Sequence, residues 1–343
     1  MRVVFVLAAA LGVSFAANYP EPQEGDFTVH DYKFRSGETL PELKLHYTTV
    51  GTLKGDNAVL IMHGTGGTGK AFLSEQFGGV LFGPGGLLDA TKFFIILPDD
   101  IGHGKSTKPS DGLGRKFPHY GYEDMVELEH RLVTDGLHAN RLRLVMGTSM
   151  GAMHTWLWGE RYPDFMDALM PLASEPIQIS GRNRFFRRMV IDALQPGSQD
   201  GLKSAIYTLM VMTSSPLQMQ KQAPTAAAAD KLFNEQVERR LKSTNIDDML
   251  YQYDCSRDYN PEPELESIKA PLFAINSADD QVNPPELGIM EKEIKRVKHG
   301  RYILIPISDE TRGHGTHSLP KIWGGYLEEL LRISEPPGAR TED

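Results

Sequence analysis

The stretch "RLRLVMGTSMGAMHTWLW", residues 141–158, decides the fold. A short apolar run leads into Gly147, Ser149 and Gly151 in the pattern G-x-S-x-G, and a helical pattern follows at once. A turn this sharp between a strand and a helix brings backbone segments so close that a Cβ at the flanking positions would clash. Glycine therefore stands there, while the serine hydroxyl is held out beyond the end of the strand. We predict that Ser149 is a nucleophile at a tight turn.

The same kind of apolar run recurs along the chain. Besides residues 141–147, short continuous runs occupy 58–64, 93–100, 168–174, 271–277 and 301–307. Such runs are typical of strands buried on both faces of a parallel sheet, and helical stretches such as 122–137 alternate with them. Residues 27–34 and 43–53 alternate in polarity and predict an antiparallel pair before them. The chain is thus predicted to be an α/β protein.

One region interrupts this alternation. Between about Glu175 and Ser267 there is no strand run, but there are helical patterns around "RNRFFRRMVIDAL", "LKSAIYTLMVM" and "ADKLFNEQVERRLKS". Ligands of open α/β sheets bind at the carboxyl ends of the strands, so a helical insertion here predicts a lid over that edge. We expect a core of residues 18–174 and 268–343, with a lid of residues 175–267.

A serine nucleophile needs a base, and the base needs an acid that fixes its tautomer. The loop after one late strand offers Asp279 and Asp280, and the loop after the next offers His314 and His317. We favour Asp280, which leaves Asp279 as a solvated loop charge or helix cap. We favour His314, because its flanking glycines permit a tight loop, and His317 remains the alternative base or a residue of the ligand pocket.

The stretch "HGTGGTGKAF", residues 63–72, resembles a phosphate-binding loop. In such a loop a hydroxyl after the lysine holds Mg²⁺, but Ala71 follows Lys70 here. The glycine-rich turn suits an oxyanion hole better, with the backbone N–H groups of Thr65 and Met150 as donors. Lys70 is then expected to be a solvated charge at a helix start.

The segments "GPGGLLDATKFFIILPDDIGHGKST", "GTSMGAMHTWLWGERYPDFMDALMPLAS" and "NSADDQVNPPE" resemble the homoserine O-acetyltransferase branch of the α/β-hydrolase fold. The resemblance runs from about Thr28 to Leu331. It implies a mostly parallel sheet flanked by helices, a nucleophilic serine, an Asp280–His314 pair and a helical lid.

The sequence also departs from this family. The "HGTGGTG" turn is richer in glycine, and the lid is shorter and lacks an expected tryptophan- and tyrosine-bearing stretch. Four lid arginines could bind a carboxylate or form an exposed basic helix face: Arg182, Arg184, Arg187 and Arg188.

Composition limits the partners. The 343 residues carry a net charge of −9, which argues against nucleic acid as a binding partner. The single cysteine, Cys255, excludes an internal disulfide and argues against a zinc site built from thiolates. No cofactor or metal is expected. Residues 1–17 read as a secretory signal, with Ser14 and Ala16 at positions −3 and −1 of a cleavage site, and no later run is apolar enough to span a membrane.

These features predict a secreted or periplasmic serine hydrolase that cleaves a carboxylic ester or related acyl compound through an acyl-enzyme on Ser149. The alternative is a homoserine O-acetyltransferase-like acyltransferase, since both reactions use the same serine, base and oxyanion hole. The exported location favours hydrolysis, because acyl-coenzyme A is cytosolic. A third possibility is a binding protein that keeps the fold without the chemistry.

Overall fold

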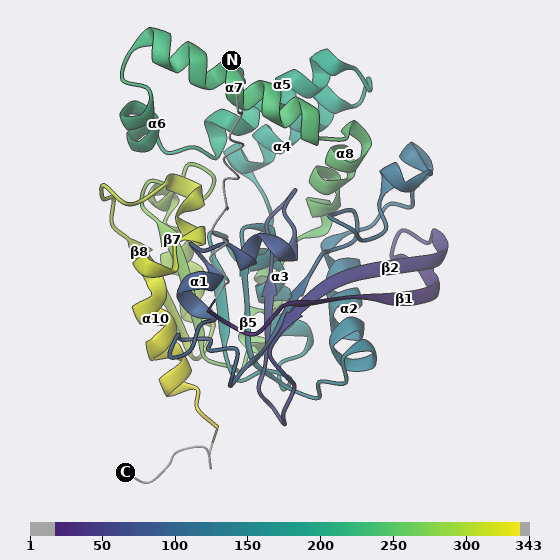
Figure 1. Ribbon diagram of the computed structural model, residues 1–343, viewed down its shortest axis with the longest axis vertical. Coiled ribbons are helices and arrows are strands. Elements are labelled where there is room, and N and C mark those ends of the chain that lie inside the picture. Colours follow the sequence, from purple (N-terminus) through teal and green to yellow (C-terminus); the bar gives the residue numbers. More distant parts are fainter. Residues whose placement is uncertain (1–17, 337–343) are drawn as a thin grey trace, which may run out of the picture.

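The computed structural model describes residues 18–336, and its centre is an eight-stranded sheet with the order β1-β2-β4-β3-β5-β6-β7-β8 (Figure 1). The strands are β1 Gln23–Lys33, β2 Thr39–Val50, β3 Ala58–Met62, β4 Phe94–Pro98, β5 Leu142–Thr148, β6 Leu169–Leu172, β7 Leu272–Ser277 and β8 Gly300–Ile305. Each apolar or alternating run predicted to be a strand is a strand in the structure. β1 pairs antiparallel with β2, and β2 pairs antiparallel with β4, while every other pairing is parallel.

The burial of the strands explains their composition. All five residues of β3 and of β4 are buried, whereas exposed and buried residues mix along β1. A central strand of a parallel sheet is covered by helices on both faces, so its residues are continuously apolar. An edge strand such as β1 is not covered on both faces. The predicted difference between the N-terminal pair and the later strands is therefore confirmed for β3 to β7. It is wrong for β8, which was predicted to be buried on both faces but lies at the edge of the sheet with Arg301 and Leu304 exposed.

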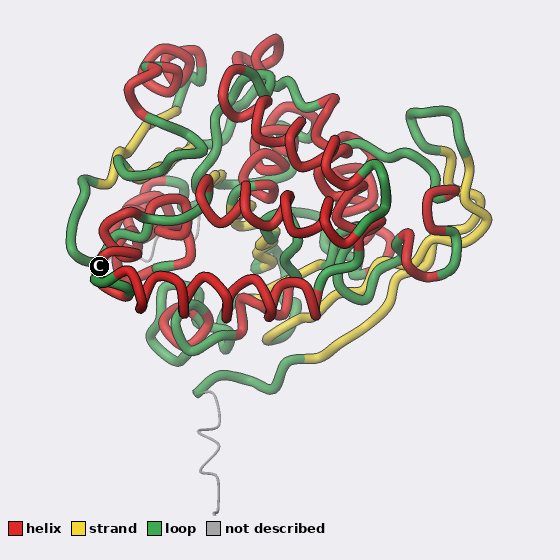
Figure 2. The backbone as a smooth tube through the Cα atoms, turned by 90° about the horizontal axis from the view of Figure 1, so that it is seen from above, coloured by secondary structure: helices red, strands yellow, loops and turns green. Residues whose placement is uncertain are grey.

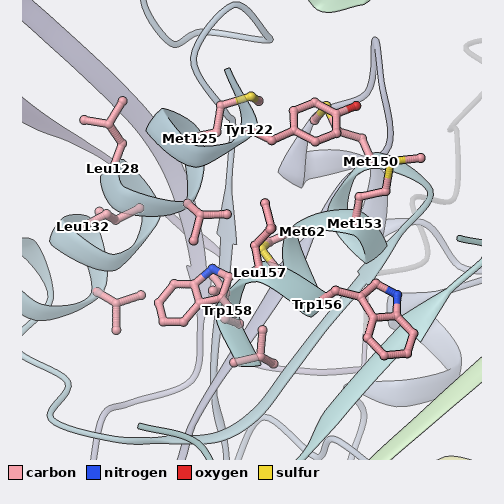
Figure 3. Packing of buried hydrophobic residues seen from close by; sticks show 14 of the residues in the cluster. Met62, Tyr122, Met125, Leu128, Leu132, Met150, Met153, Trp156, Leu157 and Trp158 are labelled. Atoms are coloured by element: carbon pink, nitrogen blue, oxygen red, sulfur yellow. The ribbon is translucent and has the colours of Figure 1, made fainter. Parts of the chain in front are cut away.

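Helices cover both faces of the sheet. α2 Tyr122–Arg131 and α3 Met150–Arg161 pack on one face, and α1 Gly78–Leu81 and α10 Pro320–Ile333 pack on the other. The short helix α9 Ile289–Glu293 lies between β7 and β8 in the chain. Figure 3 shows part of the first of these cores, in which Trp158 of α3 lies near Met62 of β3, and which also contains Trp156 of α3 and Leu128 of α2.

The lid is a layer of helices between β6 and β7 in the chain, and it lies above the sheet in Figure 1. Seen from above, these helices cover much of the fold (Figure 2). They are α4 Gly181–Leu194, α5 Gln199–Met212, α6 Pro216–Gln222, α7 Ala226–Ser243 and α8 Ile246–Asp254. The lid has a hydrophobic core of its own, which includes Val190, Leu202 and Leu209.

The sequence patterns predicted α4, α5 and α7 but not α6 or α8. These two are short, at seven and nine residues, so each offers few turns over which an apolar pattern can be recognised. Each nevertheless begins at a side-chain cap, Ser215 for α6 and Asn245 for α8. Capping residues were the signal that could have located them.

The predicted secretory signal of residues 1–17 lies outside the described residues. Within residues 18–336, no helix has the length and apolar character that crossing a membrane requires. Cys255 is buried, as expected for a residue in or near the core.

Candidate active site

Ser149 sits at the turn between β5 and α3 in a strained conformation. Its φ of 54° and ψ of −107° lie where a residue with a side chain is rare. The flanking glycines are required by contact: a Cβ at Gly147 would lie 2.2 Å from the Gly151 backbone, and one at Gly151 would lie 2.2 Å from the carbonyl oxygen of Met62. The close packing therefore accounts for both glycines.

Three side chains from distant parts of the chain form a continuous hydrogen-bonded line. His314 Nε2 lies 2.8 Å from Ser149 Oγ, and His314 Nδ1 lies 2.8 Å from Asp280 Oδ2. Ser149 follows β5, Asp280 follows β7 and His314 follows β8. Because these strands run parallel in one sheet, their carboxyl ends deliver the three loops to one edge.

Asp280 is held as an anion by its surroundings. Burial by itself would raise its pKa, but the charge of His314 and hydrogen bonds from His314, the Asn283 amide and the Val282 backbone N–H outweigh burial and lower the pKa. The Val282 N–H donates at 2.8 Å and the Asn283 Nδ2 at 3.0 Å. A carboxylate fixed in this way keeps the imidazole Nδ1 protonated and leaves Nε2 free to accept a proton from Ser149.

Asp279 was expected to be a solvated loop charge or helix cap, and this was wrong. It is only 6% exposed, and its carboxylate accepts hydrogen bonds from four groups. They are Ser277 Oγ at 2.5 Å, Gly313 N at 2.9 Å, Thr311 Oγ1 at 3.1 Å and Ser215 Oγ at 3.3 Å. Asp279 therefore ties the loop that carries His314 to the end of β7 and to the capping residue of lid helix α6.

The glycine-rich loop after β3 lies against Ser149. A Cβ at Gly64 would lie 3.3 Å from Ser149 Cβ and 3.9 Å from Ser149 Oγ. The backbone N–H of Met150 belongs to the first turn of α3, where no intrahelical acceptor exists. Within residues 18–336, neither this N–H nor that of Thr65 donates to a protein acceptor. Both N–H groups are thus free of protein acceptors, which the predicted oxyanion hole requires.

His63 fixes the loop and was not singled out from the sequence. Its Nδ1 donates to the Gly64 carbonyl oxygen at 2.8 Å, and its Nε2 accepts the Asp100 backbone N–H at 3.1 Å. The Gly67 N–H also donates to the Gly64 oxygen, at 2.9 Å. The C=O and N–H of a trans peptide point in opposite directions, so fixing the Gly64 oxygen also directs the Thr65 N–H.

A cavity of about 300 Å³ opens above Ser149. Apolar side chains of the core and lid, including Phe72, Phe77 and Phe186, form part of its wall. His317 lies in the same wall, and its ring is nearly perpendicular to that of His314, with centroids 5.4 Å apart. Burial, helped by the nearby His314, lowers the pKa of His317 to about 3, so this ring stays neutral. His314 hydrogen bonds to Ser149, and His317 is a pocket residue.

Arg187 also lines this cavity, although it is only 3% exposed. Its Nε donates to Asn183 Oδ1 at 3.0 Å and its Nη1 to Ser256 Oγ at 3.1 Å, and both partners are neutral. No carboxylate of residues 18–336 forms an ion pair with it. The expectation of an exposed basic helix face therefore fails for Arg187, although it holds for Arg188. Lys70 is exposed, as predicted, and pairs with Glu24.

A second polar cluster lies beneath the site. Ligand atoms of Asp100, Glu129 and His154 lie within 4.8 Å of one another, and all three side chains are buried. His154 Nδ1 lies 2.7 Å from Glu129 Oε1, and Trp158 Nε1 donates to Glu129 Oε2 at 2.7 Å. Burial raises the pKa of Glu129 to about 7. The donor set could hold a cation, but the hydrogen bonds already give Glu129 two partners.

Comparisons with known proteins match this chain to an established fold family. The chain matches the family model of the alpha/beta hydrolase fold over residues 57–306. It is 26% identical over 275 residues to a probable acyltransferase of Methanothermobacter thermautotrophicus, covering 76% of this chain and 84% of that protein. The crystal structure of esterase E22 superposes with a TM-score of 0.79 at 17% identity, covering 91% of this chain and all (100%) of the other.

Two further relatives differ in the reaction that their names describe. Homoserine O-acetyltransferase of Chlorobium luteolum is 36% identical over 174 residues, covering 48% of this chain and 46% of that protein. Ethyl acetate hydrolase of Pseudomonas veronii is 32% identical over 195 residues, covering 54% of each chain. These matches thus span about half of each relative. The chain belongs to the α/β-hydrolase fold family, in the branch that resembles the homoserine O-acetyltransferases and that also contains ester hydrolases.

Proposed function

We propose that the protein is a serine hydrolase that cleaves a carboxylic ester through an acyl-enzyme on Ser149, with His314 as base and Asp280 as the orienting acid. The observation that carries this proposal is the pair of 2.8 Å contacts from His314 to Ser149 and to Asp280. A serine hydroxyl is a weak nucleophile until such a base takes its proton.

The chemistry proceeds in two halves. Ser149 Oγ attacks the ester carbonyl while His314 Nε2 takes its proton, and the backbone N–H groups of Thr65 and Met150 stabilise the oxyanion that forms. The ester C–O bond then breaks, and His314 protonates the departing alcohol. In the second half a water gives its proton to His314 and attacks the acyl-enzyme, and the carboxylic acid leaves as Ser149 regains its proton.

The choice of water as the acceptor is supported by two observations. Residues 1–17 have the pattern of a secretory signal, and an exported enzyme has no supply of acyl-coenzyme A. The hydrolase relative of Pseudomonas veronii also lies in this branch of the family. A secreted or periplasmic location belongs to the same proposal. A processed chain beginning close to residue 18, found by mass spectrometry of exported protein, would support it.

The alternative is acyl transfer to an alcohol that carries a carboxylate, and Arg187 is the observation that favours it. A buried guanidinium without an acidic partner is costly unless an anion binds it, and this one faces the cavity above Ser149. An acceptor such as homoserine would supply that carboxylate. The acyltransferase relatives are consistent with this second reading.

One experiment decides between the two reactions. The protein is incubated with 4-nitrophenyl acetate in water and, separately, with acetyl-coenzyme A and homoserine. We expect ester hydrolysis that falls at least ~10⁴-fold in Ser149→Ala but not in Ser204→Ala, a matched change at an exposed serine. Thioester loss that depends on homoserine would replace hydrolysis by acyl transfer. If neither assay showed turnover and a fluorophosphonate did not label Ser149, both reactions would be rejected in favour of a binding protein without catalytic activity.

A further inference from the structure

A second cavity of about 400 Å³ adjoins the cavity above Ser149, and we call it the side chamber. Its walls are the oxyanion loop, residues 65–68, and the lid helices α5, α7 and α8, which Figure 1 shows above the sheet. The two cavities share three lining residues, Thr65, Gly67 and Tyr253. The two cavities are thus neighbours on either side of these residues, and a substrate group that passes the oxyanion loop would enter the side chamber.

The side chamber contains an arginine without a partner. Arg240 of α7 is half-buried, and its guanidinium makes no ion pair or hydrogen bond with any residue of the part of the chain that the structure describes. Because Arg240 is partly buried, its charge is partly shielded from water, and this burial lowers its pKa. A guanidinium stays charged in proteins, so a partly dehydrated and unpaired one favours the binding of an anion.

Tyr253 stands between this arginine and Arg187 of the first cavity. The guanidinium carbon of Arg187 lies 5.8 Å from the centre of the Tyr253 ring. Burial raises the pKa of Tyr253 to about 12, while the positive charges of Arg187 and Arg240 both act against that rise. Tyr253 lines both cavities, with Arg187 in the wall of the first cavity and Arg240 in the wall of the side chamber.

The other charged groups of the side chamber are already paired. Lys108 Nζ donates to Asp111 Oδ1 at 3.0 Å. The carboxylate of Asp248 accepts the Ser110 backbone N–H at 2.8 Å and the Ser110 hydroxyl at 2.7 Å. Among the charged residues that line this chamber within residues 18–336, Arg240 alone has no partner.

We propose that the side chamber is a subsite for an anionic group of the substrate, a carboxylate or a phosphate, held by the Arg240 guanidinium with the Tyr253 hydroxyl as a second donor. The substrates would then be esters that carry a negative charge at a distance from the ester bond. This inference rests on the proposed function, because it names the substrate class of the same site.

The test compares three esters that share one reacting group: phenyl acetate, 4-acetoxybenzoate and 4-acetoxyphenyl phosphate. The kcat/KM of each charged ester is divided by that of phenyl acetate within the same variant, so that differences in folded enzyme cancel. We expect this ratio to fall about 10- to 100-fold in Arg240→Gln, the loss expected for a hydrogen bond to a charged group. In Arg239→Gln, the neighbouring exposed arginine of the same helix, it should stay as in the wild type.

The ratios for the carboxylate ester and for the phosphate ester show which of the two anions the subsite binds. An unchanged ratio for both esters in Arg240→Gln would overturn the inference, as would an equal fall in Arg239→Gln. If the wild type hydrolyses none of the esters, the proposed function fails, and the subsite is then tested by calorimetry with 4-hydroxybenzoate and inorganic phosphate. Binding that the wild type shows and Arg240→Gln loses would keep the subsite. Equal binding by both proteins, or none by either, would reject it.

Discussion

The imidazole Nδ1 of His63 donates to the carbonyl oxygen of Gly64 at 2.8 Å, so a side chain buried beneath the oxyanion loop sets the direction of the peptide that ends in the Thr65 N–H. The proposed catalytic use of that N–H thus depends on a residue outside the proposed reacting groups. The contact leads to the first of four predictions.

We expect His63→Ala to lower kcat for an ester at least ~10-fold while KM changes little. The reason is that the oxyanion forms only after the substrate has bound. A displaced Thr65 N–H would weaken or lose its hydrogen bond to that oxyanion. Steady-state kinetics with 4-nitrophenyl acetate provide the measurement. If kcat fell and KM rose by the same factor, His63 would affect substrate binding as much as the reaction, and its role would be to shape the pocket.

Asp280→Asn and Asp279→Asn should behave differently although the two residues are adjacent. The amide introduced by Asp280→Asn would no longer hold His314 in the productive tautomer, so kcat should fall about 10⁴-fold with the fold intact. Asp279→Asn leaves one acceptor oxygen where the carboxylate accepts four hydrogen bonds, so the His314 loop and the start of α6 should loosen.

For Asp279→Asn we therefore expect a fall of several degrees in melting temperature together with a smaller loss of kcat, about 10- to 100-fold. Thermal unfolding measured beside initial rates separates the two effects. If Asp279→Asn abolished activity while Asp280→Asn retained it, the acid would have been assigned to the wrong residue.

Glu129 should make stability depend on pH. Its pKa is raised by burial to about 7 in the folded protein, against 4.5 for a glutamate side chain exposed to water. Between these values the folded state holds a proton that the unfolded chain has lost. The stability from this group is therefore fully present below pH 4.5 and is lost as pH rises through about 7. The groups that face Glu129 are Asp100, His154 and Trp158.

Urea unfolding near the two ends of this window tests the effect. The free energy of unfolding of the wild type should fall more between about pH 5 and about pH 8 than that of Glu129→Gln. Glu127→Gln, on the same helix but partly exposed, should keep the wild-type pH dependence. Parallel curves for wild type and Glu129→Gln would show that the buried carboxyl does not titrate in this range.

Gly151 should not tolerate a methyl group. A Cβ there would meet the Met62 carbonyl oxygen at 2.2 Å and the carbonyl carbon at 2.4 Å, so β3 and α3 would have to separate. We expect Gly151→Ala to lose about 1–3 kcal/mol of stability, or more, by overpacking. Gly325→Ala is the matched control, because nothing lies within 4 Å of its Cβ position on α10. A Gly151→Ala protein as stable as wild type would contradict the close approach.

Much of the fold was predictable because its signals are local. Continuous apolar runs mark β3 to β7, since strands covered on both faces must be apolar throughout, and G-x-S-x-G marks a turn where two backbone segments approach closely. The order of Ser149, an acid loop and a histidine loop along the chain was equally readable. The helices α6 and α8 were not predicted, because seven and nine residues offer few turns over which an apolar pattern can be recognised.

The sequence by itself determined the class of fold, the serine at its turn and the two loops that could supply an acid and a base. The tertiary structure decided that His314 contacts Ser149 and that Asp280 contacts His314. It also decided that Asp279 is a buried anchor, that His63 fixes the oxyanion loop and that Arg187 is buried without an acid. The physical reason is that neighbouring residues of one loop share the same local signal. Their burial and partners are set by contacts with segments far away in the chain, which appear only when the sheet brings the loops together.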